Sequence, residues 1–138
     1  MKSLKLVVLM AFLSLFLTFS CVISDIPLSV ELVSPANESV FNHYPRSMTL
    51  EWTAKGITGS VKYYLEIQFC WIHSTDPDNP NYFGVWEEGN YTGTVLEKTV
   101  NYYNFNFIGA QPGRWRVRAE DGNGFCEWTE WWYFKFTV

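Results

Sequence analysis

The sequence predicts an all-β protein, folded as an antiparallel sandwich of about seven strands. The chain has 138 residues, of which 19% are aromatic and only 17% are charged, and this composition favours strands around an apolar core. After the N-terminal segment, apolar residues recur with a period of two, and turn-forming residues separate the runs. A small barrel is the alternative architecture, and either one makes a single domain of a chain this long.

Alternation of apolar and polar side chains marks each strand in turn. The strand-like runs are residues 30–32, 48–52, 61–69, 83–86, 94–97, 103–107, 115–119 and 132–136. Pro35 ends the first run, and the second places Leu50 and Trp52 together on one face, which is therefore buried. The run at 61–69 is the most regular, whereas those at 83–86 and 94–97 are short.

Turn and loop signals separate these runs. They occur at residues 35–39, 44–47, 55–60, 73–81, 109–113 and 121–124. The last of these, Asp121-Gly122-Asn123-Gly124, is a strong hairpin signal. Aromatic residues at inward strand positions are predicted to form the core, and they are Trp52, Tyr63, Phe69, Phe105, Phe107, Trp115, Trp132, Phe134 and Phe136.

The N-terminal segment predicts export. Two lysines precede a long apolar run, the pattern of a helical secretory signal peptide covering residues 1–20. An uncleaved membrane anchor and a lipid on Cys21 are the alternatives. Residues 21–27 are then a tether, and residues 28–138 are a domain that is secreted or held on the outer face of the cell membrane. Without residues 1–20 the chain has eight basic and fourteen acidic residues, so its exported part is acidic.

No constellation of residues in the exported part indicates catalysis or a cofactor. His43 and His73 have no nucleophile or metal ligand at a characteristic spacing, and Glu87-Glu88 is typical of a solvated turn. The acidic charge disfavours nucleic acid as a partner. Oxygen-bearing side chains gather in one loop without the glutamate that closes a calcium site, so a plain polar loop is predicted there; they are Asp76, Asp78, Asn79 and Asn81.

Several short motifs occur in a familiar order. They are Ser34-Pro35-Ala36-Asn37, Leu50-Glu51-Trp52-Thr53, residues 63–67, residues 115–121, Gly124 and Trp128-Thr129. In this order they resemble strands A, B, C, F and G of fibronectin type III-like domains in exported prokaryotic proteins. The resemblance covers residues 28–138 and implies an immunoglobulin-like β-sandwich. Gly113 stands at the position where the family has a tyrosine, whose hydroxyl makes a hydrogen bond that stabilises a strand corner. In this chain that hydrogen bond must be replaced or lost.

A second departure from the family is the length of the segment between residues 70 and 93. Long loops on a rigid scaffold often carry function, so we expect any special role to lie there. The aromatic residues that flank the segment are Trp71, Tyr82, Phe83, Trp86 and Tyr91. They either pack the segment onto the sheet or present a platform for a carbohydrate.

The run Trp128-Thr129-Glu130-Trp131-Trp132 resembles the Trp-Ser-x-Trp-Ser box of cytokine-receptor domains of this fold. A spacing of three puts its first two tryptophans on one side of a polyproline-like segment. Arg114, Arg116 and Arg118 point outward from the neighbouring strand and are expected to insert between those rings. Such a cation–π ladder stiffens the sheet by about 0.5–1 kcal/mol per exposed contact. Direct ligand contact by these residues is the alternative.

Export makes covalent modification relevant. Asn37 and Asn90 begin glycosylation sequons. If Cys21 is removed or lipidated, Cys70 and Cys126 remain, and an even number invites a disulfide. In the resembling sandwich, however, these two lie near opposite poles, and a strand of about eight residues spans roughly 25 Å, whereas bonded cysteines need Cα atoms within about 7 Å. A bond between Cys126 and Cys21, or two free thiols, are the alternatives.

The sequence therefore predicts a non-catalytic binding or structural module at the cell surface. Its expected partner is an extracellular protein, in interaction or adhesion. Carbohydrate binding through Trp71, Tyr82 and Trp86 is the alternative function. Contact with a membrane is expected only through the N-terminal segment or a lipid on Cys21.

Overall fold

The computed structural model describes residues 25–41, 47–72, 79, 81–106, 109 and 111–137. These residues form nine strands: β1 (Ser29–Ser34), β2 (Ser39–Phe41), β3 (Ser47–Lys55), β4 (Lys62–Cys70), β5 (Tyr91–Lys98), β6 (Tyr102–Asn106), β7 (Gly113–Asp121), β8 (Gly124–Phe125) and β9 (Trp132–Phe136). The sequence-based expectations that fall outside the described residues concern the signal peptide, Cys21, His43, His73, Asp76, Asp78 and Phe107. Within the described ranges, no helix has the length and apolar character needed to cross a membrane.

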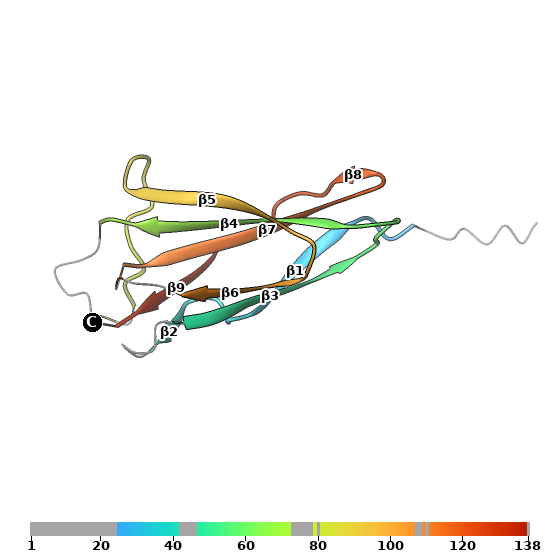
Figure 1. Ribbon diagram of the computed structural model, residues 1–138. Helices are drawn as coiled ribbons and strands as arrows, with labels where there is room; N and C mark the ends of the chain where they lie inside the picture. The colour runs from blue at the N-terminus through green and yellow to red at the C-terminus, as the bar shows by residue number, and fades with distance from the viewer. Residues whose placement is uncertain are drawn as a thin grey trace, which may run out of the picture.

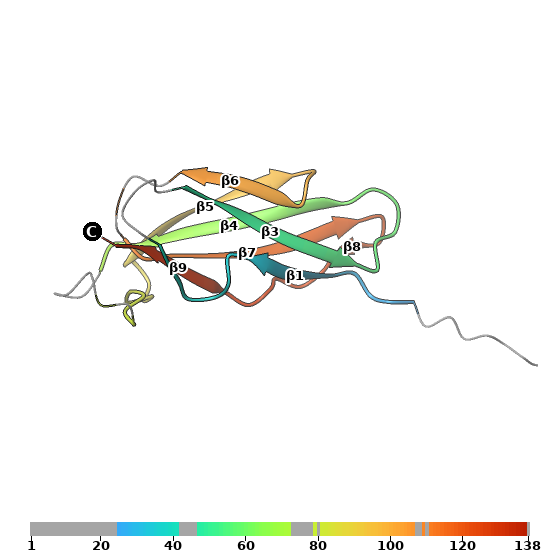
Figure 2. The same cartoon turned by 90° about the horizontal axis from the view of Figure 1, so that it is seen from below.

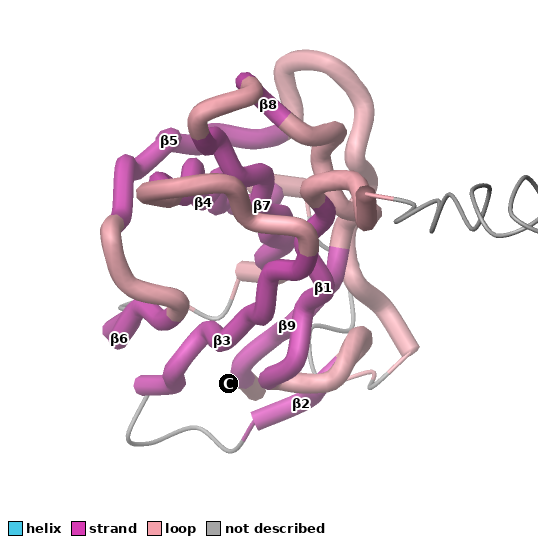
Figure 3. The backbone as a smooth tube through the Cα atoms, turned by 90° about the vertical axis from the view of Figure 1, so that its right-hand side faces the viewer, coloured by secondary structure: helices cyan, strands magenta, loops and turns pink. Residues whose placement is uncertain are grey.

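The strands form two sheets that face each other as a β-sandwich (Figures 1 and 2). One sheet has the order β1-β3-β6, and the other has the order β2-β9-β7-β4-β5, with β8 paired to β7. The predicted all-β class and its sandwich architecture are confirmed, and an end-on view shows the two layers of strands (Figure 3). β3 pairs antiparallel with both of its neighbours, as does β4, so the most regular sequence runs occupy central positions.

The chain changes sheets between β1 and β2, a step that the sequence does not predict. β1 pairs with β3 in the smaller sheet, whereas β2 runs parallel to β9 in the larger one. Glu38 N–H donates to the Tyr133 carbonyl at 2.8 Å, and Thr137 N–H donates to the Phe41 carbonyl at 3.0 Å. β2 has three residues, too few for a period of two to stand out beside a turn signal.

Aromatic and branched aliphatic side chains from both sheets fill the space between them. Trp52 and Trp115 are fully buried, with ring centroids 6.4 Å apart, and Phe69 stacks on Phe105 across the sandwich at 5.7 Å. The aromatic residues predicted for the core lie in or against it, apart from Phe107, which is outside the described residues. Each fully buried side chain of this size contributes about 1.5–3 kcal/mol, so this core supplies most of the driving force for folding.

Two predicted strands near residue 90 differ from the structure. Residues 83–86 are irregular, and their backbone lies against other segments instead of a ladder partner. β5 is longer than the predicted 94–97, because each residue from Tyr91 to Lys98 opposes one of β4 without a break in register. Exposed polar positions in β5 weaken its apolar signal in the sequence.

Gly113, at the start of β7, lies directly against the ring of Phe134 on β9. A Cβ atom at this position would lie 2.2 Å from Cζ of Phe134, and the whole edge of that ring would be within 2.8 Å. The Phe134 ring is fully buried and fills the place of a side chain at residue 113. The absence of a side chain at Gly113 therefore permits the close approach of the Phe134 ring to the β7 backbone.

Gly113→Ala is expected to destabilise the protein by about 1–3 kcal/mol, because the added methyl group overpacks the Phe134 ring. Urea denaturation of the purified protein measures the change. Val100→Ala, at a residue 45% exposed, is the surface control and should stay within about 0.5 kcal/mol. Equal stability of the two variants would contradict the role assigned to Phe134.

Candidate functional site

The candidate site lies on the outer face of the larger sheet, where arginine, aromatic and acidic side chains contact one another. Alternation along β7 sends Trp115 and Val117 into the core, and it sends Arg114, Arg116 and Arg118 to the outside. β4 pairs with β7 so that Glu66 opposes Arg116 and Gln68 opposes Arg114. The central strand therefore builds the core with one face and this site with the other.

Guanidinium groups and indole rings alternate along this face. Arg114 Cζ lies 4.1 Å from the ring centroid of Trp131, and Arg116 Cζ lies 4.3 Å from the same ring. Arg116 also lies 4.6 Å from the Trp128 ring, on whose other side is Arg118, at 4.8 Å. All five residues singled out in the sequence thus lie in one stack, which we call the ladder.

Four further rings, of which the sequence analysis had placed Trp86 and Tyr91 in the long segment, extend the ladder at both ends. Arg114 is 4.5 Å from the Trp86 ring and 5.1 Å from the Tyr91 ring. At the other end, Arg118 is 4.3 Å from the Phe125 ring and 5.5 Å from the Tyr64 ring. The added rings come from the long connection, β5, β8 and β4, so only the folded sheet brings them together.

Polar side chains of β4 hold two of the three guanidinium groups in place. Arg116 donates from Nε and Nη2 to Oε2 of Glu66, each at 2.8 Å, in an ion pair whose side chains are 28% and 15% exposed. Arg114 Nε donates to Oε1 of Gln68 at 2.8 Å, and Gln68 in turn donates to Glu66. A half-buried pair with several bonds is less screened than a surface pair, so it fixes the ladder more firmly.

Backbone bonds dock the segment 126–131 beside β7. Thr129 N–H donates to the Val117 carbonyl, and Val117 N–H donates back to Oγ1 of Thr129. Cys126 N–H donates to the Ala119 carbonyl at 2.9 Å. The segment is thereby attached at two points, and the tryptophans between and beyond them lie over the arginines.

The long connection between β4 and β5 folds back over the same face. Gly84 lies close to Cys70, whose Sγ is 2.9 Å from where a Cβ of residue 84 would be. The Trp86 ring packs against Tyr133 at 5.8 Å and donates its Nε1–H to the Phe83 carbonyl. On β9, Lys135 is 1% exposed, and its ammonium group donates to the carbonyl of Asn79. Residues 82–86 of the connection are thus half-buried against the sheet.

The three candidate ligand-binding aromatics do not have a common environment. Trp86 is part of the ladder, and the Tyr82 hydroxyl donates to the Ile72 carbonyl at 3.1 Å. Trp71 is 55% exposed, and the neighbouring Ile72 is 47% exposed. Of the predicted platform, the structure leaves Trp71 as the one largely exposed ring.

Cys70 and Cys126 are both free, so the disulfide considered between them is not formed. Cys70 ends β4 beside the start of β7, whereas Cys126 bonds to Ala119 near the end of β7. The antiparallel pairing of β4 with β7 keeps them at opposite poles of the sheet. The buried Cys70 thiol lies 3.1 Å from the Ile72 carbonyl and 3.2 Å from the Val85 carbonyl, so it contributes to holding the connection down.

Both sequons lie in turns. Asn37 is exposed, and its Oδ1 accepts a hydrogen bond from Tyr133 N–H. Asn90 is half-buried, and its carbonyl accepts from Trp71 N–H. Glycosylation at either position remains a prediction.

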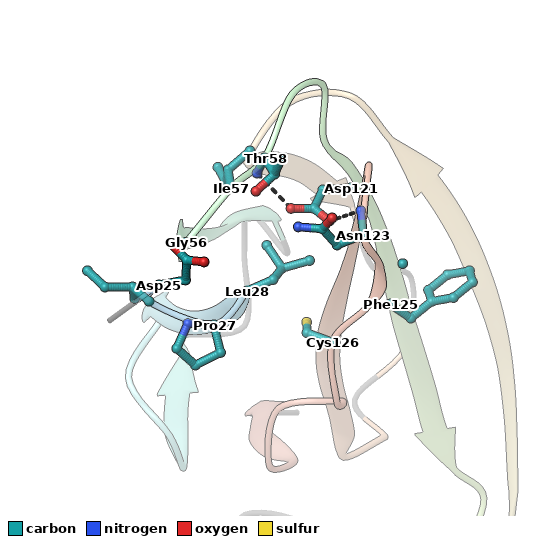
Figure 4. Close-up of a pocket in the computed structure, with 12 residues that line it drawn as sticks. Asp25, Pro27, Leu28, Gly56, Ile57, Thr58, Asp121, Asn123, Phe125 and Cys126 are labelled. Carbon is teal, nitrogen blue, oxygen red and sulfur yellow. Dashed lines mark hydrogen bonds between the residues drawn. The ribbon is translucent and has the colours of Figure 1, made fainter. Parts of the chain in front are cut away.

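A groove of 870 Å³ lies at the pole where the described chain begins, away from the long connection (Figure 4). Residues 25–28 form one wall, 56–58 another and 121–126 the third. Both carboxylate oxygens of Asp121 accept backbone N–H groups, from Thr58 at 2.7 Å and Asn123 at 2.8 Å. This carboxylate therefore stabilises the turn of the hairpin that the sequence predicts at residues 121–124.

In the described part of the chain, no three side chains of the His, Cys, Asp and Glu types are grouped to hold a metal ion. Asn79 and Asn81, from the oxygen-rich loop, bond to each other through Asn79 Oδ1 and Asn81 N–H. The Lys135 ammonium group on the Asn79 carbonyl would repel a cation at this point.

Comparison with known proteins does not assign this chain to a family. No family model and no curated protein matches the sequence. Among solved structures, the chain is similar to the PKD domain (329–428) from human KIAA0319, with a TM-score of 0.40 and 14% identity over 80% of each chain.

Trp131→Ala is expected to destabilise the protein by about 2 kcal/mol, because it removes the ring between two guanidinium groups. Trp71→Ala, at an exposed ring, should cost less than about 0.5 kcal/mol. Thermal and urea unfolding compare the variants. If Trp71→Ala lowered the free energy of unfolding as much as Trp131→Ala, the ladder would not be the stabilising element.

The pKa of the Tyr64 phenol lies above its ordinary value of 10.0, because its hydroxyl donates to Glu120 Oε2 at 2.7 Å and ionisation would place two negative charges together. Because folding raises this pKa, the Tyr64 hydrogen bond contributes its full stabilisation below the pKa of tyrosine in the unfolded chain. That contribution is lost as the pH rises through the pKa of Tyr64 in the folded protein. Glu120→Gln should lower the pKa of Tyr64. NMR titration of labelled tyrosine, assigned with Tyr64→Phe, tests this, and an unchanged Tyr64 titration would contradict it.

Proposed function

We propose that this chain is an exported, non-catalytic binding module of the fibronectin type III-like kind, which engages an extracellular protein. In this proposal residues 1–20 direct export, residues 21–27 are a tether, and residues 28–138 are the binding domain. The module is secreted or held on the outer face of the membrane through its N-terminal segment or a lipid on Cys21.

The observation that carries the proposal is the placement of the exposed residues Trp71 and Ile72. They begin the long connection at one pole, whereas residues 25–28 join the domain at the other (Figure 1). The ladder and the buried Cys70 hold the connection against the sheet at that pole. A large apolar pair on a fixed support loses little entropy on binding, and tryptophan is enriched among residues that dominate protein interfaces.

Carbohydrate binding remains the second candidate, and its support is now the exposed Trp71 ring. Arg114 lies over the Trp86 ring, and the tilted rings of Tyr91 and Tyr133 pack against it, so Trp86 is less accessible to a sugar than Trp71. A single exposed ring makes a poor platform for an extended glycan, and it suits a protein contact better.

A photo-crosslinking amino acid at residue 71, in the full chain expressed in its source cells, tests the proposal. We expect a discrete cross-linked protein, absent when the same group is placed at Val33, which is 51% exposed on the opposite sheet. Cross-linking equal at both positions, or at neither, would contradict protein binding through this pole.

Two further measurements separate the other parts of the proposal. A glycan array probed with the purified chain and with Trp71→Ala should be negative, and a signal that Trp71→Ala abolishes would favour the carbohydrate alternative. Deleting residues 2–20 should keep the chain inside the cell. If the deleted form were still exported, residues 1–20 would not be the export signal.

A further inference from the structure

We infer that β5 is a self-association edge, through which a second copy of this chain pairs antiparallel and extends the larger sheet across a twofold axis. This interface is separate from the pole proposed above. β5 is an unprotected edge, its free backbone groups point away from the sheet, and its own sequence allows it to pair with a second copy.

β5 is the longest unprotected edge in the described structure. It has eight residues, pairs only with β4, and contains neither a proline nor a break in register. The other edges are blunted, since β1 has an irregularity between Leu32 and Ser34, β6 has five residues and β2 has three. Natural proteins normally shorten, bend or cover such edges, so a regular edge of this length is suited to pairing.

The hydrogen-bonding phase of β5 identifies its free groups. Trp71 N–H donates to the carbonyl of Asn90, its direct partner, at 2.7 Å. Because hydrogen-bonded and non-bonded pairs alternate along an antiparallel ladder, residues 92, 94, 96 and 98 also direct their backbone groups to β4. The N–H and C=O groups of residues 91, 93, 95 and 97 therefore point away from the sheet.

The free backbone groups of these four residues can form hydrogen bonds with the same groups of a second copy. With Thr94 on the twofold axis, residue 91 opposes residue 97 and residue 93 opposes residue 95, so every free group of the four finds a partner. Centring the pair on Val95 instead would leave Tyr91 without one. The same reversed strand thus complements β5 in the Thr94 register, which favours a second copy over an unrelated peptide.

Side chains are compatible with the Thr94 register. Val95, which is 52% exposed, would cover the bare backbone of Gly93 in the partner. Glu97 would oppose Tyr91, and its charge is already matched by Lys62 of its own chain at 3.1 Å. No like charges face each other, and Thr94 would meet its own symmetry mate, a favourable pair.

The size of the contact sets the expected strength. A single pair of strands buries less than the area of about 1,200 Å² at which stable complexes begin, so the dimer should be weak. A dissociation constant in the micromolar range or above is expected. Confinement of the chain to a membrane surface would raise its local concentration and favour the dimer.

Disulfide trapping in the full chain tests the inference and its register. In a non-hydrogen-bonded antiparallel pair the Cα atoms are about 4.5 Å apart, within the range that a disulfide spans. Thr94→Cys should therefore give a covalent dimer under mild oxidation. Thr92→Cys, which would oppose Leu96 and not itself, should give no more than the unmodified chain, whose own cysteines set the background.

Sedimentation of the purified full chain supplies an independent measurement. The unmodified chain should show a reversible dimer, and Val95→Lys should weaken it at least tenfold while leaving the circular dichroism spectrum unchanged. A chain that stays monomeric up to millimolar concentration would overturn the inference. So would association that Val95→Lys leaves intact, or equal trapping of Thr92→Cys and Thr94→Cys.

Discussion

The alternation of side chains along β7 is the constraint on which the rest of the molecule depends. β7 lies between β4 and β9 in the larger sheet, with the core on one side and the ladder on the other. A shift of one residue would bury three guanidinium groups and expose Trp115, which is energetically prohibitive. The register of the sheet is therefore set from both of its faces at once.

The ladder explains why so aromatic a chain has few exposed rings on this face. Each arginine lies against two or more rings, and those rings are drawn from five separate segments, namely β4, the long connection, β5, β8 and residues 126–131. Because Trp86 belongs to this stack, the long connection is anchored to the sheet. Of the large apolar side chains that the structure describes in this connection, Trp71 and Ile72 are the exposed ones, and their exposure is the basis of the proposed function.

The central strands are evident in the sequence, whereas the structure of the peripheral segments is not. The runs around Trp52 and Trp115 alternate strictly because one of their faces is fully buried. The sequence predicts a short strand at residues 83–86, yet this segment is irregular and its Trp86 side chain packs on the outer face of the larger sheet. β2 went unpredicted because its three residues are held by β9, a partner more than ninety positions further along the chain.

The sequence alone determined the all-β class, the burial of the alternating aromatics and the arginines of the ladder, because a period of two is a local property of the chain. Only the tertiary structure decided which rings complete the ladder, where the chain changes sheets and which edge stays open. These depend on contacts between residues far apart in sequence, such as Phe125 with Arg118 and Trp86 with Arg114, and on the register that the whole core imposes.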